Sequence, residues 1–497
     1  MSRQTIQRIR KGLGSGYPLI YVRSDEEGRL EALLQRIANA HYGDERPLVG
    51  WTGTRGFVRK NALSEPVTDP LQALRHIHDH GQSCFYLLKD FPLLLDGRPE
   101  LTRALRDLYA VLPARNCFVF LSCSEVRIPD ALARQIFIVS LEPPHEDEVL
   151  ALLKRMVSQQ GVAPRYPESV LQPLAASMRG FTLDEITHLL KRLIASGITG
   201  VEACLAEIHE DKAVALMREG CLKYIDARVD LERVGGLENL KEWVTSRSQF
   251  FTRGGLASGV PLPSGVLFMG VSGCGKSMAA KVIAGAWSLP LVRLDMNLVL
   301  SGAHGSPEYA FDRALRVAEQ MAPLVLWIDE MENSFGYDTD QRGGINPNIF
   351  SSFLTWMQEK PAGVFVVATA NRIEKLPAEV IRKGRFDQLF FLDLPNDEER
   401  KQIFRIHLDA SGADAATAFD LGALAAVTRN WSGSEIEQAV RAAVVRAWQE
   451  KRPFTERDVF WSASRMVPLS KTMDEQIKQL RAWSQERATP ASRKPPA

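Results

Sequence analysis

The residues best suited to chemistry in this chain form a phosphate-binding turn. Residues 270–277 read GVSGCGKS and fit the pattern GxxxxGK[ST], directly after the apolar run 266–269. We therefore expect a buried strand to lead into a glycine-rich turn whose backbone N–H groups point at an anion, and a helix beginning near Lys276 to add its partial positive charge. In this pattern Lys276 reaches the β- and γ-phosphates of a nucleotide, and the Ser277 hydroxyl ligates Mg²⁺. The predicted nucleotide-binding residues of the turn are Gly273, Cys274, Gly275, Lys276 and Ser277.

Two acidic residues follow the next strongly apolar segment. Residues 323–328 read PLVLWI and are followed by Asp329 and Glu330. A buried parallel strand reads as a continuous apolar run, and ligands collect at the carboxyl edge of such a sheet. We therefore expect Asp329 beside the metal ion and Glu330 where it can orient and polarise the attacking water. The alternative is a core strand followed by a solvated acidic turn.

A third apolar run ends in a polar amide, and two arginines follow it. Residues 364–370 read VFVVATA and precede Asn371, which could hydrogen-bond the γ-phosphate and the attacking water. A loop asparagine that caps the following turn is the alternative. Arg382 and Arg385 come next in the chain, with Gly384 between them; by themselves they could simply be solvated.

In this order the motifs resemble those of one family. Residues 225–465 are similar to an AAA-family ATPase module of the AAA+ superfamily, and the stretches VGGLENLK (234–241) and FLTWMQEK (353–360) resemble the branch encoded as a hypothetical reading frame in chloroplast and cyanobacterial genomes, with bacterial relatives. By this resemblance, Val234 and Gly235 belong to the glycine loop that approaches adenine. Gly433 begins the lid helix that packs over the base and ribose.

The resemblance also implies a fold and an activity. The fold is α/β, an AAA+ phosphate-loop parallel sheet with a helical lid, and the activity is hydrolysis of ATP with Mg²⁺. Arg382 and Arg385 would point at the phosphates of a neighbouring subunit, which implies a homo-hexameric ring that remodels or regulates a protein partner. Residues 303–305 read AHG where many family members carry a pore aromatic, which argues against threading of a polypeptide.

The first half of the chain repeats the pattern of the second half without its chemistry. Residues 174–179 (LAASMR) match residues 424–429 (LAAVTR), and the match continues ungapped into the expected lid helix. Where a phosphate loop should stand, residues 23–28 read RSDEEG, with three acids and no lysine. We interpret this half as a degenerate AAA-like α/β domain; general similarity among parallel α/β sheets is the alternative.

These observations predict four parts. Residues 1–220 form the degenerate domain, residues 221–397 the large ATPase subdomain, and residues 398–487 the lid and C-terminal helices. Residues 488–497 are rich in Pro, Ser and Lys and are expected to be disordered.

Composition narrows the functional classes. With 45% hydrophobic and 24% charged residues the chain has the make-up of a soluble globular protein, and no apolar run approaches a membrane span. A net charge of +1 argues against a nucleic-acid partner on electrostatic grounds. Six scattered cysteines without a CxxC pair suggest the reducing cytoplasm. Two alternative functions stay open: a nucleotide-gated switch or assembly scaffold with slow hydrolysis, and a nucleic-acid-associated remodeller.

Overall fold

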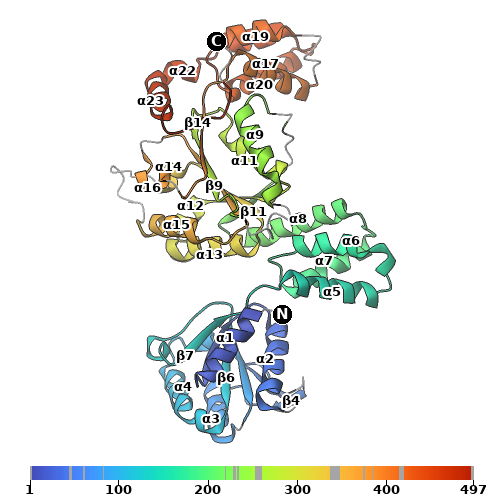
Figure 1. The fold of residues 1–497 in the computed structure, drawn as a ribbon, viewed down its shortest axis with the longest axis vertical. Coiled ribbons are helices and arrows are strands. Elements are labelled where there is room, and N and C mark those ends of the chain that lie inside the picture. The colour runs from blue at the N-terminus through green and yellow to red at the C-terminus, as the bar shows by residue number, and fades with distance from the viewer. Residues whose placement is uncertain are drawn as a thin grey trace. The chain divides into compact units, whose positions relative to one another are not determined.

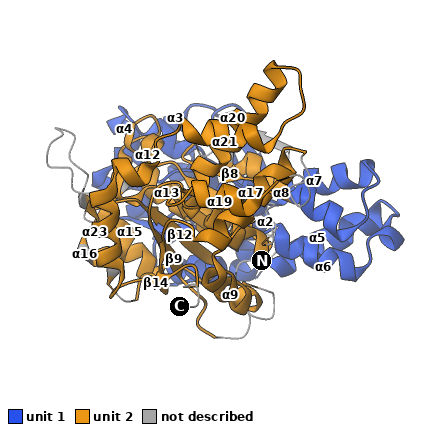
Figure 2. Ribbon diagram, turned by 90° about the horizontal axis from the view of Figure 1, so that it is seen from above, with its two compact units in different colours: residues 1–208 blue, residues 209–497 orange. Residues whose placement is uncertain are grey.

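The computed structural model divides the chain into two compact units, residues 1–208 and 209–497 (Figure 2). The boundary expected at residue 220 therefore moves into helix α8 (Val201–Arg218), because Leu216 near the end of that helix belongs to the core of the second unit. The residues that the structure describes are 3–43, 48–59, 62–81, 83–218, 220–227, 231, 234–251, 260–335, 347–372, 375–382, 384–412 and 419–493.

The first unit is built on a seven-stranded sheet of order β4-β3-β2-β5-β6-β1-β7 (Figure 1). Five strands are parallel, and β3 and β4 are added as antiparallel neighbours. Its strands are β1 (Leu19–Arg23), β2 (Val49–Thr52), β3 (Gly56–Arg59), β4 (Ala62–Glu65), β5 (Phe85–Lys89), β6 (Phe118–Cys123) and β7 (Ile136–Ser140).

Helices cover both faces of this sheet because its strands are apolar on both sides. Alternate side chains of β1 join two different core clusters: Leu19 and Tyr21 pack with α3 and α4, whereas Ile20 and Val22 pack with α1 and α2. A helical group, α5 to α8, follows. The helices are α1 (Arg3–Gly14), α2 (Glu27–Tyr42), α3 (Pro70–His80), α4 (Pro99–Val111), α5 (Glu146–Gln159), α6 (Glu168–Ser177) and α7 (Leu183–Ala195), besides α8.

The second unit also contains a seven-stranded sheet, of order β14-β13-β9-β12-β11-β10-β8. Among the strands in the described part of this unit, β8 alone runs antiparallel to its neighbour. Its strands are β8 (Leu222–Ile225), β9 (Gly265–Gly270), β10 (Leu291–Leu294), β11 (Leu324–Ile328), β12 (Val364–Ala370), β13 (Gln388–Leu392) and β14 (Thr489–Pro490).

Helices flank the second sheet and then form a lid. Val266 and Phe268 of β9 face the side covered by α9 and α11, and Leu267 and Met269 face the side covered by α13 and α15. The helices around the sheet are α9 (Glu238–Arg247), α11 (Lys276–Ala286), α12 (Met296–Leu300), α13 (Pro307–Gln320), α14 (Met331–Phe335), α15 (Pro347–Glu359) and α16 (Ala378–Ile381). The lid and C-terminal helices are α17 (Asp397–Ala410), α19 (Leu421–Val427), α20 (Gly433–Gln449), α21 (Glu456–Ser464), α22 (Leu469–Thr472) and α23 (Asp474–Ser484).

The two sheets share one strand order. The run β7-β1-β6-β5-β2 in the first unit corresponds to β13-β9-β12-β11-β10 in the second, all parallel, and a helical group follows each sheet. This correspondence supports the interpretation that the halves repeat one architecture, with β1 in the place of the strand that precedes the phosphate loop.

The expected disorder of the C-terminal residues is wrong for the part that the structure describes. Thr489 and Pro490 form β14 at the edge of the second sheet, and Ala491 is fully buried. A proline is compatible with an edge strand, since the ladder needs no N–H from it on the open side. Residues 494–497, also expected to be disordered, lie outside the described residues.

Candidate functional site

The phosphate-binding turn has the backbone that its glycines permit. Gly270, Gly273 and Gly275 have φ angles of 145°, 78° and 94°, which other residues rarely adopt. A Cβ on Gly270 would lie 2.0 Å from the carbonyl oxygen of Leu392, so the turn passes directly against β13. Helix α11 then begins at Lys276, as predicted, and its N-terminus opens on the turn.

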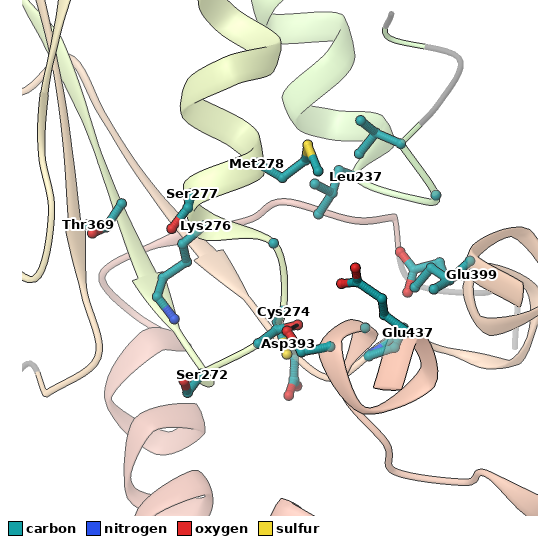
Figure 3. Close-up of a pocket in the computed structure, with 18 of the residues that line it drawn as sticks. Leu237, Ser272, Cys274, Lys276, Ser277, Met278, Thr369, Asp393, Glu399 and Glu437 are labelled. Atoms are coloured by element: carbon teal, nitrogen blue, oxygen red, sulfur yellow. Dashed lines mark hydrogen bonds between the residues drawn. The ribbon is translucent and has the colours of Figure 1, made fainter. Parts of the chain in front are cut away.

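One cavity of about 400 Å³ brings most of the predicted residues together. Its wall is formed by the turn, the ends of β11 and β12, the glycine loop before α9, and the lid helices α17 and α20 (Figure 3). The predicted residues that line it are Val234, Gly235, Gly273, Cys274, Gly275, Lys276, Ser277, Asp329, Glu330, Asn371 and Gly433.

Lys276 is held within the turn itself. The residue is 7% exposed, and its Nζ donates hydrogen bonds to the carbonyl oxygens of Gly270 (2.9 Å) and Val271 (2.8 Å). Burial lowers the pKa of Lys276, and the nearby carboxylates, among them Asp329, oppose that shift. A phosphate group in the cavity would add negative charge beside this ammonium and so stabilise its protonated form.

The acidic pair lies where β11 ends, next to β12. Thr369 of β12 donates its hydroxyl proton to Oδ1 of Asp329 (2.6 Å), and the Thr369 hydroxyl oxygen accepts a hydrogen bond from the backbone N–H of Glu330 (3.0 Å). Glu330 has a φ of 47°, a left-handed conformation that costs energy in a residue with a side chain. The threonine therefore fixes both acids at the carboxyl edge of the sheet.

Two side-chain amides hold the carboxylate of Glu330. Asn333 donates to Oε2 (2.7 Å) and Asn371 donates to Oε1 (3.3 Å). The backbone N–H of Asn371 donates in turn to Glu332 (2.7 Å), whose pKa is raised by burial. Asn371 is thus connected to Glu330 and to Glu332, and not only to a turn of its own.

The far end of the cavity is closed by the lid helices α17 and α20. A Cβ on Gly235 would lie 2.8 Å from Ile403 of α17, so the glycine loop and the lid are in close contact. The N–H of Ser434 at the start of α20 donates to the carbonyl oxygen of Gly273 (3.1 Å). Burial lowers the pKa of His407, a further residue of this wall, which keeps its imidazole uncharged at neutral pH.

The environment of Cys274 disfavours ionisation of its thiol. Burial raises the pKa of its thiol to about 12, so the thiolate that oxidants attack is scarce at neutral pH. In Figure 3, Cys274 lies beside Asp393, another residue of the cavity wall.

The structure does not bring the two predicted arginines to the cavity of their own chain. Arg382 is exposed, and Arg385 donates a hydrogen bond to the carbonyl oxygen of Glu379. Neither is among the described residues that line the cavity. Their action on a neighbouring subunit stays a prediction.

Several residues of the site were not anticipated from the sequence. Thr369 could have been found from the sequence, because it places a hydroxyl in an otherwise apolar run, two residues before Asn371. Glu332 and Asn333 lie in α14, just after the acidic pair, and nothing in the sequence indicated a role for them. Ile403 and His407 are separated from the turn by more than a hundred residues, so only the fold brings them to the cavity.

The corresponding place in the first unit is filled by the chain's own charges. Glu26, in the turn after β1, accepts hydrogen bonds from the N–H of Leu183 at the start of α7 (2.6 Å) and from Arg29 (2.7 Å). Arg29 also donates to the carbonyl oxygen of Glu142 (2.6 Å) and pairs with Glu148 of α5 (3.3 Å). A carboxylate of the protein thus occupies the helix N-terminus that corresponds to the start of α20.

Two family models match parts of the chain. Residues 5–141 match the SpoVK-like AAA ATPase N-terminal domain, and residues 266–394 match the ATPase family associated with various cellular activities (AAA). The second match covers the turn, the acidic pair and Asn371. Among the described residues, no helix has the length and apolar character needed to cross a membrane.

Known relatives extend the similarity to nearly the whole chain. The AAA domain-containing protein ycf46 of Trieres chinensis is 33% identical over 477 residues, which is 95% of this chain and 95% of that protein. The ycf46 protein of Pyropia yezoensis is 33% identical over 484 residues, 96% of this chain and 97% of its own. The peroxisomal ATPase PEX1 of Dictyostelium discoideum is 23% identical over 354 residues, 66% of this chain and 28% of PEX1. The resemblance drawn from the motifs is confirmed.

Proposed function

Because this chain belongs to the AAA family of ATPases, we propose that it binds ATP with Mg²⁺ in the cavity of its second unit and hydrolyses it. The single observation that carries the proposal is the convergence of the turn, Asp329, Glu330 and Asn371 on that one cavity. Phosphoryl transfer depends on positioning and on neutralising charge, and these residues supply both.

The donors present suit magnesium. The Ser277 hydroxyl and the Asp329 carboxylate both line the cavity, and Mg²⁺ prefers such oxygen ligands. When bound, the ion would neutralise charge on the phosphates. The hydrogen bond from Thr369 fixes one oxygen of Asp329 and leaves the other for such a role.

Each remaining residue has a part in the reaction. The N–H groups of the turn and the start of α11 bind the phosphates, and Lys276 neutralises their charge. Glu330 accepts a hydrogen bond from the attacking water and polarises it, and Asn371 orients that water. The lid covers the base and excludes solvent through the contact of Ser434 with Gly273.

We further propose that turnover is coupled, in an oligomeric ring, to remodelling or regulation of a protein partner in the cytoplasm. Support comes from the family and from the position of Arg382 and Arg385 outside their own cavity. A homo-hexamer would let these arginines reach the phosphates held by the adjoining subunit.

A nucleotide-gated switch with slow hydrolysis is the second candidate, and the amides around Glu330 favour it. Both carboxylate oxygens already accept hydrogen bonds from Asn333 and Asn371, which compete with a water for Glu330. Asn333→Ala should then raise basal turnover several-fold. Unchanged or lower turnover in this variant would count against a restrained glutamate.

Isothermal calorimetry on the full chain tests nucleotide binding. Lys276→Ala should weaken ATP binding about 10- to 150-fold, since hydrogen bonds to charged groups contribute about 1.5–3 kcal/mol. Lys281→Ala is the matched control, because Lys281 lies on the same helix α11 but does not line the cavity. No heat with the parent chain, or equal affinity for both variants, would refute the proposal.

A further inference from the structure

The last described residues of the chain, 489–493, form a strap across the second unit; we call them the C-terminal strap. Thr489 and Pro490 pair in parallel with Phe390 and Phe391 of β13, and the N–H of Ala491 donates to the carbonyl oxygen of Phe391 (2.9 Å). Ala491 is fully buried in the core cluster that also holds Val234, Leu237 and Leu240. The strap is therefore part of the folded unit.

The strap caps helix α9, which has no side-chain cap of its own. The residue before the helix, Leu237, has a φ of 59°, and its side chain offers no hydrogen-bond acceptor. The carbonyl oxygen of Ala491 instead accepts the N–H of Leu240 (3.1 Å), one of the N–H groups that a helix start leaves unpaired. Asn239 donates its side-chain amide to the carbonyl oxygens of Pro490 (3.0 Å) and Ser492 (3.2 Å).

These contacts fix the glycine loop of the cavity. Val234, Gly235 and Leu237 line the cavity immediately before α9, so a strap that anchors the first turn of α9 also anchors them. Ser492 of the strap lines the same cavity. The strap thus supports the glycine loop and also forms part of the cavity wall.

The strap also supports the phosphate end of the cavity through β13. The strand next to β14 ends at Leu392, whose carbonyl oxygen accepts the N–H of Val271 in the turn (3.1 Å). The next residue, Asp393, lines the cavity and is held by Arg481 of α23 (2.8 Å). One short segment is thus connected to both ends of the site.

We propose that the C-terminal strap is a component of the nucleotide-binding site, with Ser492 lying against the nucleoside beside the loop 234–237. Docking of the strap and binding of an adenine nucleotide then stabilise each other, because coupling between two binding events is reciprocal. This inference rests on the proposed binding of ATP in the cavity.

Hydrogen–deuterium exchange on the full chain tests the coupling without any substitution. Saturating ADP with Mg²⁺ should slow exchange at least fivefold in a peptide spanning 489–493, where the Ala491 N–H reports docking. A peptide from β6 in the first unit serves as the control and should not change. Exchange of the strap that is the same with and without saturating ADP would overturn the inference.

Truncation tests the same coupling in the other direction. A chain ending at Ala488 should bind a fluorescent ADP analogue at least fivefold more weakly than a chain ending at Arg493, which lacks only residues 494–497. Equal affinity of the two chains would overturn the inference; if the shorter chain does not fold, the exchange experiment decides. A full chain that binds no nucleotide refutes the proposed function itself. A full chain that binds nucleotide without any change in the exchange of the strap, and with the same affinity after truncation, refutes only the role of the strap.

Discussion

Arg29→Ala tests whether the ion pairs of Arg29 with Glu26 and Glu148 hold the first unit together. These pairs lie at the place that corresponds to the nucleotide cavity of the second unit. The side chains of Arg29, Glu26 and Glu148 are only 6%, 10% and 12% exposed. Removing the arginine takes away a cation that pairs with both of these largely buried carboxylates. Breaking a buried pair by removing one partner costs about 3–5 kcal/mol.

The loss of stability caused by Arg29→Ala can be measured at helix α7, because Glu26 accepts a hydrogen bond from the N-terminus of this helix. A loss of about 3–5 kcal/mol corresponds to opening that is roughly 150- to 5,000-fold more frequent. Hydrogen–deuterium exchange of the α7 peptide in the full chain should accelerate by that factor.

Arg103→Ala is the matched control within the same unit. Arg103 pairs with Asp107 at 2.5 Å, but these side chains are 68% and 44% exposed, so the pair is worth at most about 1 kcal/mol. If the α7 peptide exchanges no faster in Arg29→Ala than in Arg103→Ala, the ion pairs do not hold the helices of the first unit on its sheet.

Two further predictions concern the second unit. Arg385→Ala should lower ATP turnover about 10³- to 10⁵-fold. Mixing this variant with the inactive Lys276→Ala chain should restore activity, because the Lys276→Ala chain supplies Arg385 to the intact cavity of the Arg385→Ala chain. No recovery on mixing would argue against action between subunits. Burial lowers the pKa of Lys360 from 10.5 to about 8. The unfolded chain then binds more protons between pH 8 and 10.5, so stability measured by urea unfolding should rise with pH over that interval, and Lys360→Met should flatten the rise; equal slopes in parent and variant would contradict the assignment.

The local parts of the site could be predicted from the sequence because they depend on neighbouring residues. The run 266–269 followed by GVSGCGKS predicts strand, turn and helix, and the structure has β9, the turn and α11 in those places. Asp329 and Asn371 follow apolar runs, and parallel strands bring their carboxyl ends to one edge. The shared strand order of the two sheets likewise agrees with the repeat seen between residues 174–179 and 424–429.

The parts that could not be predicted depend on contacts between distant segments. The composition of residues 488–497 suggested disorder, yet the open edge of β13 and the uncapped start of α9 bind residues 489–493. Nothing local indicated that Arg29 would reach Glu148 in another helix. The hydrogen bond from Asn333 to Glu330 likewise depends on the left-handed backbone of Glu330, which the sequence does not reveal.

Glu330→Gln gives the most direct test of the central claim, that this cavity binds ATP and that Glu330 activates the water. The substitution keeps the shape of the side chain and removes its negative charge. Positioned general bases contribute about 10²–10⁴ to a rate, so steady-state ATP turnover should fall by at least about a hundredfold, while the affinity for ATP measured by calorimetry stays within about twofold of the parent. Turnover equal to that of the parent would contradict the account.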